Sequence, residues 1–181
     1  MKTFLAQLHH YSIDAVVDVR SVPFSAYYYE FDQNRVASSL KQNNIYYIDL
    51  GKELGPRSKN PEHYDKKGQV QFDRLMNSSL FNEGVNRLLK GLEKGFTIAL
   101  MCAEKDPSHC HRSLLIADSL EKRYNITVQH ITHEGALESE SELKYRLLES
   151  GGFESDLFFD QNALLKKAYE QQIRKKAYRK D

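Results

Sequence analysis

The sequence has few cysteines and no long apolar segment, and each shortage excludes a class of protein. Only two cysteines occur, Cys102 and Cys110, whereas a secreted domain held by disulfides would carry more, spread through the chain. No run of about 18 apolar residues is present, so we expect no membrane-spanning helix. The N-terminus also lacks the continuous apolar stretch of a signal peptide. We therefore predict a cytoplasmic protein with no membrane partner.

Net charge is nearly absent as well. The formal charge of +1 argues against a strongly basic nucleic-acid-binding protein, although a local basic patch lies near the C-terminus. What is present fits a folded chain: 181 residues, of which 40% are hydrophobic and 28% charged. This length suffices for one domain with a core plus an appendage.

Strand and helix patterns alternate along the first three quarters of the chain. Compact apolar or β-branched runs predict strands at 15–19, 45–50, 96–101 and 126–131. Helical periodicity predicts helices at 2–11, 32–44, 70–77, 81–94 and 107–124. Loops are expected at 51–57 and 58–69. This alternation predicts an α/β fold: a mostly parallel sheet covered on both faces, in three layers, α/β/α.

The composition changes beyond His133. Residues 134–149 include five glutamates and predict a charged surface helix, and Gly151 with Gly152 predicts a hinge or turn. A final basic helix is expected over 160–180. We therefore predict an α/β domain at 1–133 and a helical C-terminal extension at 134–181.

The most informative stretch runs from Cys102 to Arg112, after the third predicted strand. Ligands of open α/β sheets bind at the carboxyl ends of the strands, and this stretch follows such an end. Asp106, followed by proline, predicts a helix start. Cys110 and His111 would then lie in the first helical turn, where free N–H groups and the helix dipole favour anions and lower a thiol pKa.

Three chemical readings of this stretch stay open. In the first, a phosphate or carboxylate binds the helix N-terminus and Arg112 clamps it. In the second, one of the cysteines is a thiolate nucleophile with His109 or His111 as its base. In the third, a metal ion is held by Cys102, Glu104, Cys110 and His111, although the spacing is not the paired spacing of common zinc sites. A purely structural reading has Cys102 buried, His111 capping and Arg112 in an ion pair.

Other predicted strand ends supply polar partners. Asp18 and Arg20 end the first strand, where a salt bridge and a catalytic role are equally compatible with the pattern. Glu53 and Arg57 follow the second strand, and His130 and His133 end the last one, where a structural role is typical. We expect the side chains of Asp18, Glu53 and Arg112 to meet in one polar pocket.

Aromatic and basic segments favour a different class of partner. Tyr27, Tyr28 and Tyr29 lie in a loop after Pro23 and could stack on bases, close the core or form a dimer contact. The basic helix at 160–180 could bind nucleic-acid phosphates, or be an ordinary solvated face.

The residues resemble a known family, the domain of unknown function 488. The resemblance covers about 1–132 and is carried by 17–23 (VDVRSVP), 50–55 (LGKELG) with Arg57, 101–107 (MCAEKDP) and 110–113 (CHRS), with 128–131 (VQHI) as a closing strand. The family is similar in build to a three-layer α/β fold and has no settled activity. Relatives usually open with a strand and a Gly-His or Gly-Tyr turn, whereas this chain begins within the following helix. Two explanations stay open: the start of this sequence is assigned too late, or this member lacks the N-terminal strand and the polar turn after it.

The resemblance also implies a set of family-typical polar positions, namely Asp18, Arg20, Glu53, Arg57, Cys102, Glu104, Cys110, His111 and Arg112. Our leading hypothesis is an enzyme acting on a small anionic or nucleotide-like substrate. Its general acid or base is Glu104 or Asp18, and Arg20, Arg57 and Arg112 bind the anion. A non-catalytic nucleic-acid-binding module and a metal-binding domain at Cys102, Cys110 and His111 are the alternatives. Whether the chain is an enzyme stays open, and the sequence names no cofactor.

Overall fold

The computed structural model describes residues 1–25, 27–151 and 160–180. These residues belong to two compact units, one built from 1–65 and 70–103 and the other from 66–69 and 104–181. Gly151 follows the last residue of a helix, whereas Gly152, the second residue of the predicted hinge, lies outside the described residues.

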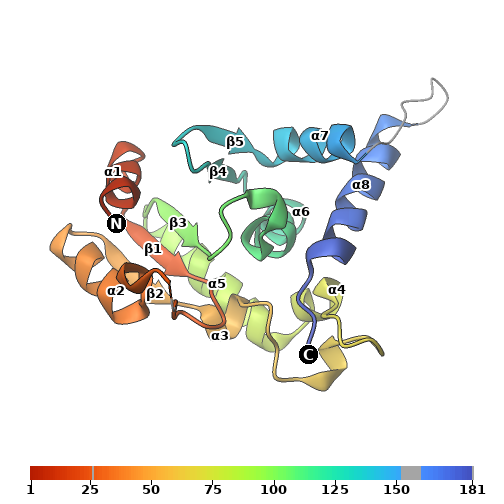
Figure 1. The fold of residues 1–181 in the computed structure, drawn as a ribbon, viewed down its shortest axis with the longest axis horizontal. Coiled ribbons are helices and arrows are strands. Elements are labelled where there is room, and N and C mark those ends of the chain that lie inside the picture. Colours follow the sequence, from red (N-terminus) through yellow and green to blue (C-terminus); the bar gives the residue numbers. More distant parts are fainter. Residues whose placement is uncertain (26, 152–159, 181) are drawn as a thin grey trace. The chain divides into compact units, whose positions relative to one another are not determined.

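A parallel three-stranded sheet forms the centre of the first unit. Its strands are β1 (Ala15–Asp18), β2 (Tyr46–Asp49) and β3 (Ile98–Met101), in the order β2-β1-β3, and β1 is parallel to both neighbours (Figure 1). All four residues of β1 are buried, as expected for a central strand covered on both faces. The predicted parallel sheet is confirmed.

Helices cover both faces of this sheet, which gives the predicted three layers. Helices α1 (Lys2–His10) and α2 (Gln33–Gln42) bury Leu8 and Leu40 against Val16 on one face. On the other face α5 (Ser79–Glu93) approaches β3 so closely that a Cβ on Gly91 would lie 2.8 Å from Ile98 Cδ1. The remaining helices of the unit are α3 (Gly51–Leu54), α4 (Phe72–Met76), η1 (Tyr29–Phe31) and η2 (Pro61–His63). The presence of α3 corrects the loop expected at 51–57.

The second unit contains the stretch expected to be one helix at 107–124, and this expectation is wrong in its first half. A 3₁₀ turn, η3 (Pro107–His109), is followed by Cys110 with extended dihedrals, φ −113° and ψ 136°. A π-helical segment, η4 (Arg112–Ala117), then leads into α6 (Asp118–Tyr124). The Asp-Pro pair starts the 3₁₀ turn and not an α-helix: Asp106 caps the turn by accepting a hydrogen bond from Ser108 N (2.8 Å).

A small antiparallel hairpin and two helices complete the second unit. Strand β4 (Gln129–Ile131) pairs with β5 (Leu137–Ser139), so the last predicted strand pairs in a hairpin and not in the parallel sheet. The helix expected at 134–149 therefore begins later, as α7 (Glu140–Ser150), with a capping box at Ser139. The basic helix is α8 (Gln161–Lys176), which contacts α7 (Figure 1).

None of the helices in the described ranges combines the length and the apolar character that crossing a membrane requires.

Candidate functional site

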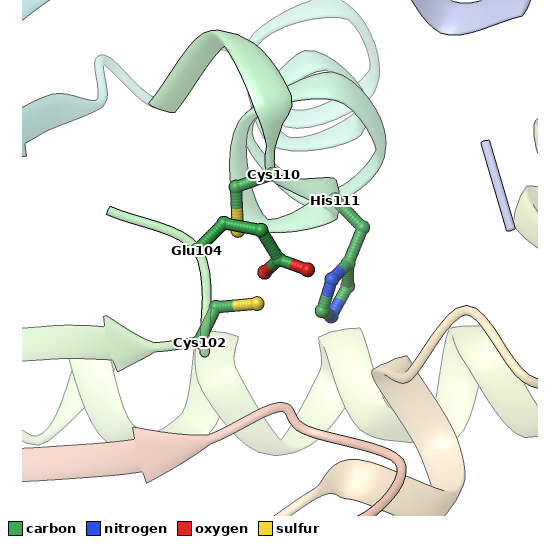
Figure 2. Close-up of side chains that lie close together, drawn as sticks. All are labelled: Cys102, Glu104, Cys110 and His111. Atoms are coloured by element: carbon green, nitrogen blue, oxygen red, sulfur yellow. The ribbon is translucent and has the colours of Figure 1, made fainter. Parts of the chain in front are cut away.

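The stretch directly after β3 brings four metal-binding side chains together. One donor atom from each of Cys102, Glu104, Cys110 and His111 can be chosen so that all four lie within 4.8 Å of one another. Figure 2 shows the two thiols, the carboxylate and the imidazole pointing toward a common centre. The chain's two cysteines, eight positions apart in sequence, thus place their sulfur atoms near each other.

Backbone geometry explains how Cys110 and His111 reach this centre. The 3₁₀ turn closes when Cys110 N donates to Pro107 O (3.0 Å), and the extended Cys110 then separates it from the π-helical segment. Cys110 Sγ accepts a hydrogen bond from Arg112 N at 3.4 Å. This bond ties the sulfur to the backbone at the start of the π-helical segment.

The four side chains differ in how deeply they are buried. Cys110 and His111 are buried, Cys102 is half-buried, and Glu104 is exposed. Within the first unit, the Arg20 guanidinium interacts electrostatically with Cys102. Glu104 is therefore the donor that water can most easily replace.

Asp18 and Arg20 form a closed ion pair beside Tyr47. Arg20 Nη2 donates to Asp18 Oδ2 (2.6 Å), Arg20 Nε to Asp18 Oδ1 (2.9 Å), and Tyr47 Oη to Asp18 Oδ2 (2.8 Å). Burial lowers the pKa of Arg20, but the bonds to Asp18 outweigh it and raise this pKa. Burial and the bond to Asp18 raise the pKa of Tyr47 well above its usual value. Asp18 and Arg20 thus form a salt bridge, one of the two roles that the sequence left open. The bonds from Arg20 engage both oxygens of the Asp18 carboxylate.

The other predicted site residues have separate partners. Glu53 Oε1 accepts from Arg87 Nη1 (2.9 Å), and the backbone N–H of Arg57 donates to Ser21 Oγ (3.1 Å). Arg112 Nη1 donates to the backbone carbonyl of Glu104 (3.3 Å). The structure therefore brings together the four donors at 102–111 and, separately, Asp18 with Arg20. That Asp18, Glu53 and Arg112 share one pocket stays a prediction.

Sequence reasoning missed a buried polar network in the second unit. Glu140, which was expected on a charged surface helix, is fully buried. It accepts from His130 Nε2 (2.7 Å), Tyr169 Oη (2.8 Å) and Ser113 Oγ (3.3 Å). Burial raises the pKa of Glu140, but the hydrogen bond from His130 and the other donors outweigh this and hold it below its usual value. His130 thus has the structural role that its position suggested. The position of this histidine at a strand end was the signal in the sequence that pointed toward the network.

The predicted nucleic-acid segments are exposed. Tyr27, Tyr28 and Tyr29 are 88%, 68% and 59% exposed. The charged side chains of α8 and the residues after it are also exposed, namely Lys166, Lys167, Arg174, Lys175, Lys176, Arg179 and Lys180.

Comparison with known proteins identifies the family. A family model described as Domain of unknown function DUF488 matches residues 1–118, which includes all the family-typical polar positions. The match ends before β4, so it is shorter than the resemblance recognised in the sequence. No curated protein and no solved structure matches the chain. Because the family model covers well over half of the sequence, the chain belongs to the family of the domain of unknown function DUF488.

Proposed function

We propose that the stretch 102–111 binds a divalent transition-metal ion, with zinc the best match. Cys102, Cys110 and His111 are the protein ligands, and Glu104 is an exchangeable fourth donor. The observation that carries this proposal is the approach of four donor atoms to within 4.8 Å of one another. Two sulfurs and an imidazole favour zinc or another borderline-soft ion over magnesium or calcium.

The distances fit such an ion. With Zn–S bonds of about 2.3 Å and Zn–N bonds of about 2.0 Å, the donors of a tetrahedral site stand roughly 3.3–3.8 Å apart. Donors within 4.8 Å of one another need to move inward by only about an ångström, a shift that side-chain rotations supply. The N–H donor to Cys110 also fixes the orientation of that sulfur, as outer contacts commonly do for metal ligands.

The exposure of Glu104 supports chemistry at the metal. A metal held by Cys102, Cys110 and His111 would supply Lewis-acid activation of water, and Glu104 would be a nearby proton acceptor. This reading combines the metal site with the general acid or base role predicted for Glu104. An anionic substrate, with Arg112 as a candidate partner, remains part of the proposal.

Metal content tests the proposal directly. We expect purified protein, kept reduced and incubated with Zn²⁺ and then desalted, to retain about one ion per chain by elemental analysis. His111→Ala and Cys110→Ser should abolish retention. His109→Ala is the matched control, because His109 is an exposed neighbour outside the donor group. Wild-type protein that retains no Zn²⁺, or a His111→Ala variant that retains it fully, would overturn the proposal.

Nucleic-acid binding is the second candidate, supported by the exposed tyrosines and the exposed basic side chains of α8. It predicts oligonucleotide binding that weakens steeply with salt. The double variant Lys175→Glu, Lys176→Glu should abolish that binding in the full chain. Binding that is absent at low salt would exclude this candidate.

A further inference from the structure

The metal-ligand stretch has little regular structure of its own. Between Asp106 and Ser113 the backbone passes through a 3₁₀ turn, an extended residue and the start of a π-helical segment. Such a stretch leaves Cys110 and His111 dependent on contacts from elsewhere, because outer contacts usually fix the orientation of metal ligands. In the second unit these contacts come from α7, α8 and the strands before them.

The first contact holds the beginning of the stretch. Arg146, on α7, donates to both oxygens of Asp106, with Nη2–Oδ1 at 3.0 Å and Nη1–Oδ2 at 3.2 Å. The same guanidinium is fixed by Glu138 on β5, with Nε–Oε1 at 2.7 Å. The carboxylate held in this way also caps the 3₁₀ turn, because Asp106 Oδ1 accepts a hydrogen bond from Ser108 N.

The second contact holds the middle of the stretch. Gln172, on α8, donates from Nε2 to the carbonyl oxygen of Ser108 at 2.6 Å. Ser108 is two residues before Cys110 and is itself buried. A shift of this carbonyl would move the turn that ends at Cys110.

The third contact holds the end of the stretch. Tyr169, one turn before Gln172 on α8, donates to the Ser113 carbonyl (3.3 Å) and to Glu140 (2.8 Å). Glu140 in turn accepts from the Ser113 hydroxyl. Ser113 is two residues after His111, so both sides of the ligand pair are anchored.

We propose that Arg146, Tyr169 and Gln172 are positioning residues that hold Cys110 and His111 in metal-binding geometry. This inference rests on the proposed metal site. All three residues lie beyond residue 118, where the family match ends. The C-terminal helices are thus part of the scaffold of the site and not a separate appendage.

Metal affinity and the Co²⁺ spectrum of the full-length protein test this role. Gln172→Met keeps the length of the side chain but removes the donor to Ser108, and Arg146→Lys keeps the charge but removes the two-pronged contact with Asp106. We expect each variant to bind Zn²⁺ about tenfold or more weakly in competition with a chromophoric chelator. Their Co²⁺ ligand-field bands should also shift or broaden. A merely structural role would lower the melting temperature and leave the spectrum unchanged.

Gln171→Met is the matched control, because Gln171 is the exposed neighbour on the same helix. It should keep wild-type affinity and spectrum. The inference is overturned if Gln172→Met and Arg146→Lys both fold and bind Zn²⁺ and Co²⁺ like the wild type. If Gln172→Met does not fold, the metal binding of Arg146→Lys alone tests the inference. If Arg146→Lys does not fold, that of Gln172→Met does. Wild-type protein that binds neither ion overturns the proposed function as well, so the two failures are distinguishable.

Discussion

The Arg20 guanidinium closes onto the carboxylate of Asp18, two residues earlier, with Nη2–Oδ2 at 2.6 Å and side-chain exposures of only 8% and 0%. The pair lies where β1 ends, at the edge of the sheet where α/β proteins bind their ligands. Both residues also belong to the family-typical set. Because each charge already satisfies the other, the pair is first of all a means of keeping this strand end ordered.

Removing one partner of this pair should therefore be costly. Arg20→Ala leaves a buried, uncompensated carboxylate, and we expect a loss of about 3–5 kcal/mol in the free energy of unfolding. The double variant Asp18→Asn, Arg20→Met removes both charges and should lose less than the single variant. Urea unfolding of both variants measures the difference. A double variant that is less stable than Arg20→Ala would contradict this account of the pair.

The exposure of Glu104 leads to a prediction about the metal site. Co²⁺-loaded protein should change its visible spectrum when thiocyanate is added, because the anion takes the position that Glu104 or water leaves. Glu104→Gln should still bind Co²⁺ through Cys102, Cys110 and His111. A wild-type spectrum that stays the same at saturating thiocyanate would show a closed, four-ligand site. Lowering the pH should release the metal from both proteins, since protons compete for the sulfur and nitrogen donors.

Close packing explains two glycines of the family-typical LGKELG stretch. A Cβ on Gly51 would lie 2.1 Å from the carbonyl oxygen of Arg20, and one on Gly55 would lie 2.2 Å from Ser21 Oγ. We expect Gly51→Ala to destabilise the protein by at least about 3 kcal/mol, the upper range of overpacking. Thermal and urea unfolding measure this loss.

Gly91→Ala is the control for that substitution. Its Cβ would come closer than ordinary contact distance only to the terminal methyl of Ile98 (2.8 Å), which can rotate away, and alanine is the better helix former by about 1 kcal/mol. Its stability should stay close to that of the wild type. Equal losses in Gly51→Ala and Gly91→Ala would contradict the close-approach explanation.

Short-range patterns in the sequence sufficed for the parallel sheet and its covering helices. The buried run at 15–19 and the apolar run at 96–101 each encode a strand locally, so β1 and β3 could be predicted. The four donors at 102–111 could also be picked out, because they lie within one short stretch. Sequence spacing does not reveal that Cys110 is extended between a 3₁₀ turn and a π-helical segment, or that the four donor atoms lie within 4.8 Å of one another.

Long-range partners account for what could not be predicted. Glu140 stands among other glutamates and reads as a surface charge, yet it is buried because His130, Tyr169 and Ser113 surround it from distant positions in the chain. Likewise, nothing near Gln172 indicates that it bonds to Ser108, 64 residues away. Such contacts depend on tertiary packing, which local propensity does not contain.

The buried Glu140 makes acid stability a test of its network. Its pKa in the folded protein lies below that of an exposed glutamate, which is about 4.3. The unfolded chain therefore binds a proton more readily, and the stabilisation by Glu140 is complete above about pH 4.3 and lost as the pH falls through the lower, folded-state pKa. At pH 7 we expect Glu140→Gln to lose about 1.5–3 kcal/mol, the range for hydrogen bonds to a charged group. Urea unfolding at a series of pH values should show that the difference in unfolding free energy between Glu140→Gln and wild type narrows below about pH 4.

Glu149→Gln, an exposed substitution on the same helix, is the control and should stay within about 0.5 kcal/mol of wild type at pH 7. A gap for Glu140→Gln that stays constant from pH 7 to pH 3 would mean that the charge of Glu140 does not stabilise the fold.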